Sequence, residues 1–202
     1  MSIDLTTIGS VVGSGGSIDY FMTGIMDVTV GNNSTSYVNL SLSAYNSDYD
    51  GYLIRCFSRE HGYNNKHMYF TMNYDGNSYR YTSGQNGYTT GSTPYLQQGG
   101  SGGSYGTIPY ACNTSSMTTD YWAWTDLWMS KKYRDSSANC GTEWMYEGRG
   151  ASQSGGGFMA MGWGRYNIDT TEVTSVQLYC GSIYSYWKQN SKVTVYGIKY
   201  GS

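Results

Sequence analysis

The sequence predicts an all-β protein: a single antiparallel β-sandwich, jelly-roll-like, with a short N-terminal arm and a long loop rich in Gly and Tyr. Three observations support this fold class. Gly (28) and Tyr (23) make up a quarter of the 202 residues, while charged residues are few, and this composition is typical of strands and turns. Apolar and polar residues alternate in several segments. No segment shows the apolar period of an amphipathic helix.

The core of such a domain must be built largely from aromatic side chains. Ile, Leu, Val and Phe together number only 29. Scarce aliphatic residues are typical of disorder when the net charge is also high, but here the net charge is −2. Each Trp or Tyr can bury roughly 150–250 Å², so the 6 Trp and 23 Tyr can supply the missing apolar area. One domain of ordinary size is expected.

The N-terminal part of the chain predicts an arm of small residues followed by two strands in which apolar and polar residues alternate. Residues 1–16 are small and polar and end in glycines, which predicts an arm or linker. The sandwich domain then spans 17–202. A strand interrupted near Gly24 is expected over 18–30, and the clean alternation over 36–45 predicts another.

The next strands are expected over 52–57 and 67–74. In the second of these segments every second residue is apolar. Asp75-Gly76 and a strand over 78–82 follow. Asp-Gly tolerates the positive φ of a tight turn, so this segment carries the strongest hairpin signal in the chain.

Residues 83–107 are predicted to form a long loop. They contain Pro94 and the glycine-rich run from Gly99 to Gly103, and no charged side chain occurs between Tyr81 and Thr119. Loops of this length are usually functional or disordered. The absence of charge suggests contact with another surface, a role that tyrosine suits.

Alternation resumes in the second half of the chain. The predicted strands there are 121–129, 143–146, 158–163, 173–180 and 192–198. Short strands at roughly even spacing, separated by glycine-rich turns, favour a sandwich or a barrel.

Charge and cysteine spacing argue against several classes of function. The slightly acidic chain is unlike a nucleic-acid binder, and no apolar run is long enough to span a membrane. The start lacks the features of a secretory signal. The four cysteines, Cys56, Cys112, Cys140 and Cys180, do not have zinc or thioredoxin spacing. Reduced, mostly buried thiols are expected; a disulfide framework, with three possible connectivities, is the alternative.

No pattern predicts a catalytic, metal or cofactor site. Residues 46–51 resemble half of a calcium loop, but Phe57 stands where the last ligand is needed, so a turn is favoured. His61 and His67 have no third ligand at a suitable spacing. Glu143 and Glu147 share a strand face, yet about 13 Å of strand separates them, more than the roughly 5–9.5 Å of glycosidase pairs. Carboxylates from different strands remain an alternative.

The cluster of Trp122, Trp124 and Trp128 has two interpretations. Their even spacing places all three on one face of a strand. The favoured interpretation is that they fill a core poor in aliphatic residues. The alternative is an exposed platform for sugars or for a partner subunit.

The C-terminal segments carry a resemblance to a known family. Val173–Tyr179 and Ser191–Ile198 resemble the closing hairpin of virion proteins from tailed phages, notably marine and cyanobacterial ones. Upstream, the Ser17–Phe21 strand, the alternating segment 36–45 and the Phe57–Gly62 step follow a similar order. The resemblance implies a jelly-roll-like module of tail fibres and capsid-attached proteins.

The expected function is therefore that of a non-enzymatic bacteriophage virion protein on the particle surface, with a tail-fibre-like, receptor-binding or adhesion role. The alternatives are a capsid decoration or head-fibre protein, and a carbohydrate-binding module or polysaccharide-cleaving spike. The expected partners are other virion proteins, further copies in a homotrimer and host surface glycans, without cofactor, nucleic acid or membrane insertion. Assembly is expected in the bacterial host cytoplasm. The expected binding residues are Tyr88, Tyr95, Tyr105, Tyr110, Trp122, Trp124 and Trp128.

Overall fold

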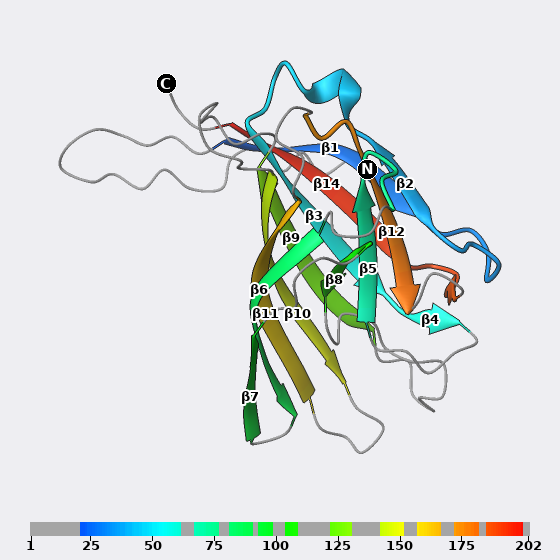
Figure 1. Ribbon diagram of the computed structural model, residues 1–202. Helices are drawn as coiled ribbons and strands as arrows, with labels where there is room; N and C mark the ends of the chain where they lie inside the picture. Colours follow the sequence, from blue (N-terminus) through cyan, green and yellow to red (C-terminus); the bar gives the residue numbers. More distant parts are fainter. Residues whose placement is uncertain are drawn as a thin grey trace.

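The computed structural model describes residues 21–61, 67–76, 81–90, 93–98, 104–108, 122–130, 142–151, 157–166, 172–181 and 185–199. These residues form two antiparallel sheets that pack as a sandwich, together with a two-stranded ribbon (Figure 1). The predicted all-β antiparallel fold is therefore confirmed, and it is compatible with a jelly-roll-like module.

The larger sheet has eight strands. In spatial order they are β1 (Phe21–Thr29), β14 (Lys192–Lys199), β3 (Gly51–Ser58), β9 (Ala123–Ser130), β10 (Thr142–Ala151), β11 (Gly157–Tyr166), β6 (Tyr81–Thr90) and β7 (Thr93–Gln98). The register of β1 on β14 shifts between Gly24 and Met26, which confirms the interruption predicted near Gly24.

The smaller sheet has four strands, and the ribbon has two. The four-stranded sheet contains β2 (Val38–Ser41), β12 (Ser175–Gly181), β5 (His67–Met72) and β8 (Gly106–Ile108), and the ribbon pairs β13 (Tyr186–Trp187) with β4 (Glu60–His61). The strand predicted over 36–45 is shorter than expected, because a 3-10 turn, η1 (Ser43–Tyr45), follows β2. Leu42 stays fully buried at this bend.

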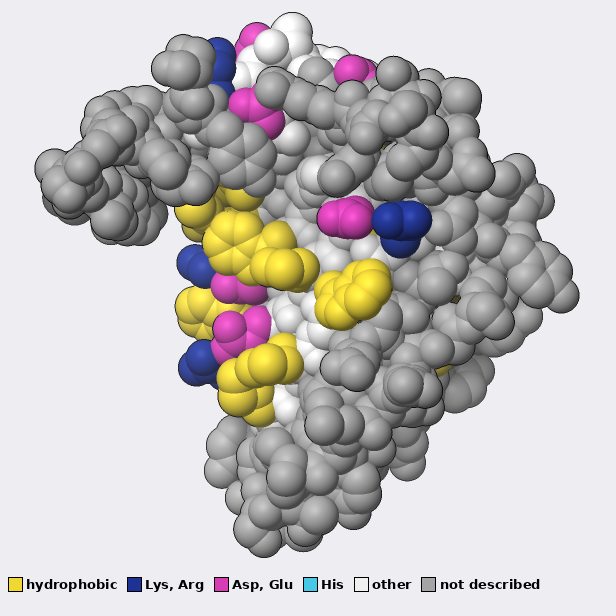
Figure 2. Space-filling view, turned by 60° about the vertical axis from the view of Figure 1, so that its left-hand side comes forward, with side chains coloured by type: hydrophobic (Ala, Val, Ile, Leu, Met, Phe, Trp, Pro, Cys, Tyr) yellow, Lys and Arg dark blue, Asp and Glu magenta, His cyan; other side chains and the backbone are white. Residues whose placement is uncertain are grey.

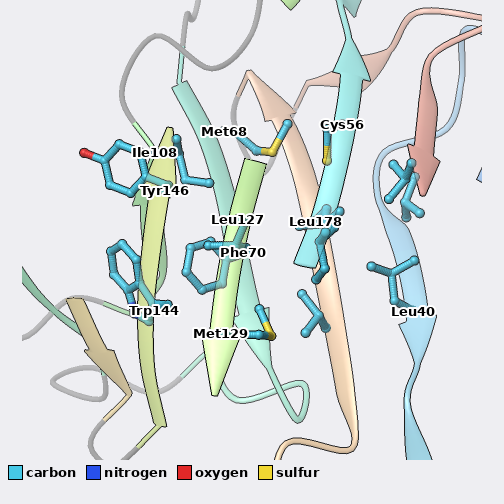
Figure 3. Packing of buried hydrophobic residues seen from close by; sticks show 14 of the residues in the cluster. Leu40, Cys56, Met68, Phe70, Ile108, Leu127, Met129, Trp144, Tyr146 and Leu178 are labelled. Atoms are coloured by element: carbon cyan, nitrogen blue, oxygen red, sulfur yellow. The ribbon is translucent and has the colours of Figure 1, made fainter. Parts of the chain in front are cut away.

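The core lies between the inner faces of the two sheets and has an aromatic centre. Phe70 of β5 meets Trp144 of β10, with ring centroids 5.2 Å apart and planes at 88°; Figure 3 shows the two rings facing each other across the sandwich. Gly164 lies opposite Trp144 in the ladder of β10 and β11. A Cβ at Gly164 would lie 2.1 Å from the indole, so the absence of a side chain makes room for Trp144.

The hairpin predicted at Asp75-Gly76 is wrong. β5 belongs to the four-stranded sheet and β6 to the eight-stranded sheet, so the chain crosses between the sheets here. The hydroxyl of Tyr81 accepts a hydrogen bond from the Met72 N–H (2.7 Å) and donates one to the Asp75 carbonyl (2.8 Å). A turn signal is local and does not specify which strands pair, and that is why it failed.

The long loop predicted over 83–107 is also wrong. β6 and β7 pair as a hairpin, and β8 adds a short strand to the other sheet. Figure 1 shows β7 at the far edge of the eight-stranded sheet, beyond the smaller sheet. A strand with no sheet facing it needs no apolar alternation, so the sequence lacks the pattern that would have revealed it.

Several remaining predictions concern residues that the structure does not describe. The arm at 1–16, Cys112, Cys140 and Tyr110 lie outside the described residues. Cys56 and Cys180 are buried in the core, as expected for most of the thiols.

The part of the chain that the structure describes contains no helix long and apolar enough to cross a membrane.

Candidate functional site

The outer face of the eight-stranded sheet carries a concentration of exposed apolar side chains, here called the Trp–Met face. It consists of Phe57 (β3), Trp124 and Trp128 (β9), Met145 (β10), and Met161 and Trp163 (β11). Figure 2 shows apolar side chains on one side of the molecule with acidic and basic side chains between them. A single exposed apolar residue is ordinary, whereas a contiguous group is a sign of a binding surface.

The alternation of β9 decides which side chains form this face. Ala123, Thr125, Leu127 and Met129 are buried, and the residues between them point outward. The favoured interpretation of the tryptophans as core residues is therefore wrong. Trp124 is 46% exposed and Trp128 36%, while Trp122 stacks on Phe57 with centroids 5.3 Å apart. The even spacing correctly predicted that the three tryptophans lie on one face. A strand with apolar residues on both faces, however, does not show which face points to the core.

The strand register gathers these residues into rows across the sheet. Trp128 lies opposite Met145, which lies opposite Trp163. Phe57 lies opposite Trp124 in a parallel row. Neighbouring strands are about 4.8 Å apart, so each row forms a continuous apolar strip rather than scattered contacts.

A buried leucine lies among these outward-facing side chains. Leu53 pairs with Trp128 on one side and with Tyr196 on the other. It is fully buried, yet it alternates with the core residues Tyr52 and Ile54 and is not part of the core cluster. Leu53 is therefore a buried apolar residue on the outer side of the sheet, separate from the main core.

Three arginines and three acids lie within the same face, and each arginine bonds one acid. Arg55 donates two hydrogen bonds to Asp126, at 2.8 and 2.9 Å. Arg149 donates from Nε to Glu147 at 2.7 Å, and Arg165 lies 3.5 Å from Glu143. Their formal charges cancel, so the described outer positions of β3, β9, β10 and β11 carry no net charge.

Arg55 contacts two aromatic rings in addition to its carboxylate partner. Its guanidinium lies 4.7 Å from the centroid of the Trp124 ring and 5.8 Å from that of Tyr196. The hydrogen bonds to Asp126 raise the pKa of Arg55 above its usual value. The Trp124 indole N–H also donates to Asp126, at 3.0 Å. These contacts fix the orientation of Trp124 within the face.

The predicted carboxylate pair shares a face as expected, and the register also brings two other acids together. Glu143 and Glu147 both point outward from β10. Glu147 lies directly opposite Asp126 of β9. Directly opposed residues of an antiparallel pair have Cβ atoms about 4.5–5.5 Å apart. Sequence alone could not find this pair, because it depends on strand register.

Three of the predicted tyrosines, Tyr88, Tyr95 and Tyr105, lie among the residues that the structure describes. Tyr88 and Tyr95 are cross-strand partners in the hairpin of β6 and β7. Tyr105 precedes β8 and packs on Tyr69 and Tyr179 of the four-stranded sheet. Phe57, Met145, Met161 and Trp163 were missed, because the strands that carry the last three are apolar or glycine-rich on both faces.

The other candidate residues have structural roles or separate positions. Asn46, first residue of the calcium-like segment, is buried; its amide bonds the Val173 carbonyl, and it accepts from the Tyr52 hydroxyl at 2.6 Å. His61 lies in the ribbon and His67 in the four-stranded sheet. Among the described residues, no three His, Cys, Asp or Glu side chains are grouped closely enough to hold a metal ion.

Comparisons of this chain with protein-family models, with curated proteins and with solved structures found no match.

Proposed function

We propose that this chain is a non-enzymatic structural protein of a bacteriophage virion surface, with a tail-fibre-like, receptor-binding or adhesion role. The observation that supports a binding role is the Trp–Met face. Six large apolar side chains are exposed together there, among charged side chains that pair with one another. The resemblance of the C-terminal strands to tailed-phage virion proteins supports the virion location. A capsid decoration role is the alternative on the same particle.

The composition of the Trp–Met face favours a protein partner. The cores of protein interfaces are enriched in aromatic residues, Met and Arg and are depleted in Lys. The described outer positions of β3, β9, β10 and β11 carry Trp, Met, Phe and Arg, no lysine, and three acids that each bond to an arginine. Trp and Arg are also the residues that most often dominate binding energy.

We assign the partner as further copies of this chain, in a homotrimer. A face whose charges cancel can approach its own copy without net repulsion. Closed symmetric assemblies are the commonest oligomers of soluble proteins, and repeated copies on a particle gain avidity from weak individual contacts. A different virion protein on the same face is the other outcome of the test.

Sedimentation velocity of the purified chain tests the assignment. We expect a concentration-dependent trimer, and we expect Trp163→Ser combined with Met145→Ser to shift it toward monomer. Tyr74→Ser is the matched control, because Tyr74 is equally exposed but lies outside the Trp–Met face. A wild-type chain that is monomeric throughout, or a double variant that remains trimeric, contradicts the assignment.

Immunogold labelling of intact virions tests the location. Labelled tails support the adhesion role, and labelled heads support decoration. Particles that carry no label in a lysate that contains the chain overturn the virion proposal.

Polysaccharide cleavage is the second candidate function, favoured by the opposition of Asp126 and Glu147. Retaining glycosidases hold their two carboxyl groups about 5–5.5 Å apart, a spacing that opposed positions on neighbouring strands allow. Binding is favoured over cleavage because Arg55 and Arg149 already occupy these carboxylates. Incubation with capsular polysaccharide or lipopolysaccharide separates the two: release of new reducing ends that Asp126→Asn abolishes would identify a hydrolase.

A further inference from the structure

The outer face of the four-stranded sheet differs chemically from the Trp–Met face, and we call it the tyrosine face. It carries the side chains of Tyr37, Asn39, Tyr69, Tyr105, Gln177 and Tyr179. The inner positions of the same strands, such as Phe70 and Leu178, belong to the core. The two outer faces of the sandwich are therefore separate surfaces.

Strand register brings the tyrosine face together from distant parts of the sequence. Tyr179 of β12 lies directly opposite Tyr69 of β5. Tyr37 immediately precedes Val38, the partner of Leu178, and its ring lies 6.2 Å from that of Tyr179. Tyr105 packs edge-on against both Tyr179 (5.8 Å) and Tyr69 (6.3 Å). The four phenol rings thus form one cluster, built from the two strands β5 and β12 and from the residues just before β2 and β8.

An amide chain fixes the polar groups beside these rings. The Tyr179 hydroxyl donates to Gln177 Oε1, and Gln177 Nε2 donates to Asn39 Oδ1 at 2.8 Å. Burial raises the pKa of Tyr179, so its hydroxyl stays protonated in the hydrogen bond to Gln177. The polar groups are therefore arranged before any ligand arrives, and preorganisation of this kind lowers the entropic cost of binding.

The tyrosine face carries no formal charge in its strands. The four strands β2, β5, β8 and β12 contain no Lys, Arg, Asp or Glu. Within these described strands an anionic ligand such as a nucleic acid would find no Lys or Arg to pair with it, and a cationic one would find no Asp or Glu. Exposed Trp and Met, which favour a protein partner on the other face, are absent from these strands' outer positions.

We infer that the tyrosine face binds an uncharged oligosaccharide. A sugar ring presents C–H groups that pack on an aromatic ring, and hydroxyls that exchange hydrogen bonds with phenols and amides. Tyr37, which is 45% exposed, offers the stacking surface, and Asn39 and Gln177 offer the polar contacts. An uncharged ligand matches a face without charge because no ionic group loses its hydration on binding.

Isothermal titration calorimetry of the full chain tests this inference. The probes are neutral oligosaccharides of glucose, galactose, mannose and N-acetylglucosamine, with sialylated and sulfated oligosaccharides as anionic arms. We expect at least one neutral probe to bind, and Tyr37→Ala or Gln177→Ala to weaken its binding about tenfold or more, equal to about 1.4 kcal/mol.

Two control variants make the result specific. Tyr74→Ser removes an exposed tyrosine outside the tyrosine face, and Trp163→Ser removes an exposed ring of the Trp–Met face; neither should change the affinity. Failure of every neutral probe overturns the inference, as does preference for the anionic arms or loss of binding only in Trp163→Ser. None of these results bears on trimer formation, so the two proposals fail independently.

Discussion

The guanidinium of Arg55 and the carboxylate of Asp126 meet side by side on neighbouring strands, with Nε–Oδ1 at 2.8 Å and Nη2–Oδ2 at 2.9 Å. The two residues are direct cross-strand partners of β3 and β9. Arg55 also lies over the Trp124 ring at 4.7 Å. A fork of donors and a flat cation are both required for this arrangement, and only arginine offers both.

Replacement of Arg55 by lysine should therefore be costly although the charge is kept. Lys cannot bond both carboxylate oxygens and lie flat on Trp124 at once. Because the Arg55 side chain is 37% exposed, we expect a loss of only about 1 kcal/mol in the free energy of unfolding, measured by urea denaturation. Arg149→Lys, at a more exposed pair, is the control and should change stability by less than about 0.5 kcal/mol. Equal effects of both variants would show that the fork is unimportant.

Two tryptophans of neighbouring strands should contribute very differently to the free energy of unfolding. Trp144→Ala empties the centre of the core beside Phe70 and should cost about 3–5 kcal/mol. Trp163→Ala removes a ring that is 51% exposed and should change stability by about 0.5 kcal/mol or less. Chemical denaturation of the purified variants measures both. A large loss for Trp163 would mean that the Trp–Met face belongs to the folding core rather than to a binding surface.

Replacing glycine by alanine should lower stability where the backbone is tightly packed and have little effect where it is open, and the eight-stranded sheet offers one position of each kind. Gly164→Ala places a methyl group 2.1 Å from the Trp144 indole, so we expect a loss of about 1–3 kcal/mol from overpacking. Gly24→Ala meets only the edge of Tyr196 at 3.9 Å, an ordinary contact, and should be tolerated. Thermal unfolding compares the pair, and a stable Gly164→Ala protein would contradict the close contact.

Stability should fall in alkali. Burial, with a smaller contribution from Glu172, raises the pKa of Tyr52 from 10.0 to about 12, and burial also raises the pKa of Tyr81 and of Tyr146. Between pH 10 and 12 the unfolded chain therefore binds fewer protons than the folded one, and the free energy of unfolding decreases as pH rises.

Urea denaturation at neutral pH and at intervals between pH 10 and 12 measures this decrease, and tyrosinate absorbance follows ionisation directly. Tyr52→Phe should show a shallower fall over the same range. A flat stability profile through this range would mean that these hydroxyls are not protected from ionisation.

The fold class and most of the strands could be predicted from local patterns in the amino-acid sequence. The alternation at Val176 and Leu178, or at Val193 and Val195, reflects one buried face of a strand, and that pattern is a local property of the chain. The glycine and tyrosine content likewise excluded a helical bundle. An aromatic core, realised at Phe70 and Trp144, follows from composition because few aliphatic residues are present.

Which face of each strand is buried, and which distant residues meet, depend on the packing of the whole sandwich. Trp144 and Met145 are adjacent and both apolar, so their pattern cannot show that the first lies in the core and the second outside. Asp126 meets Glu147, and Tyr179 meets Tyr69, through strand register. Register is set by long-range pairing and by contacts of the whole sheet, because a shift of one residue exchanges the two faces of a strand.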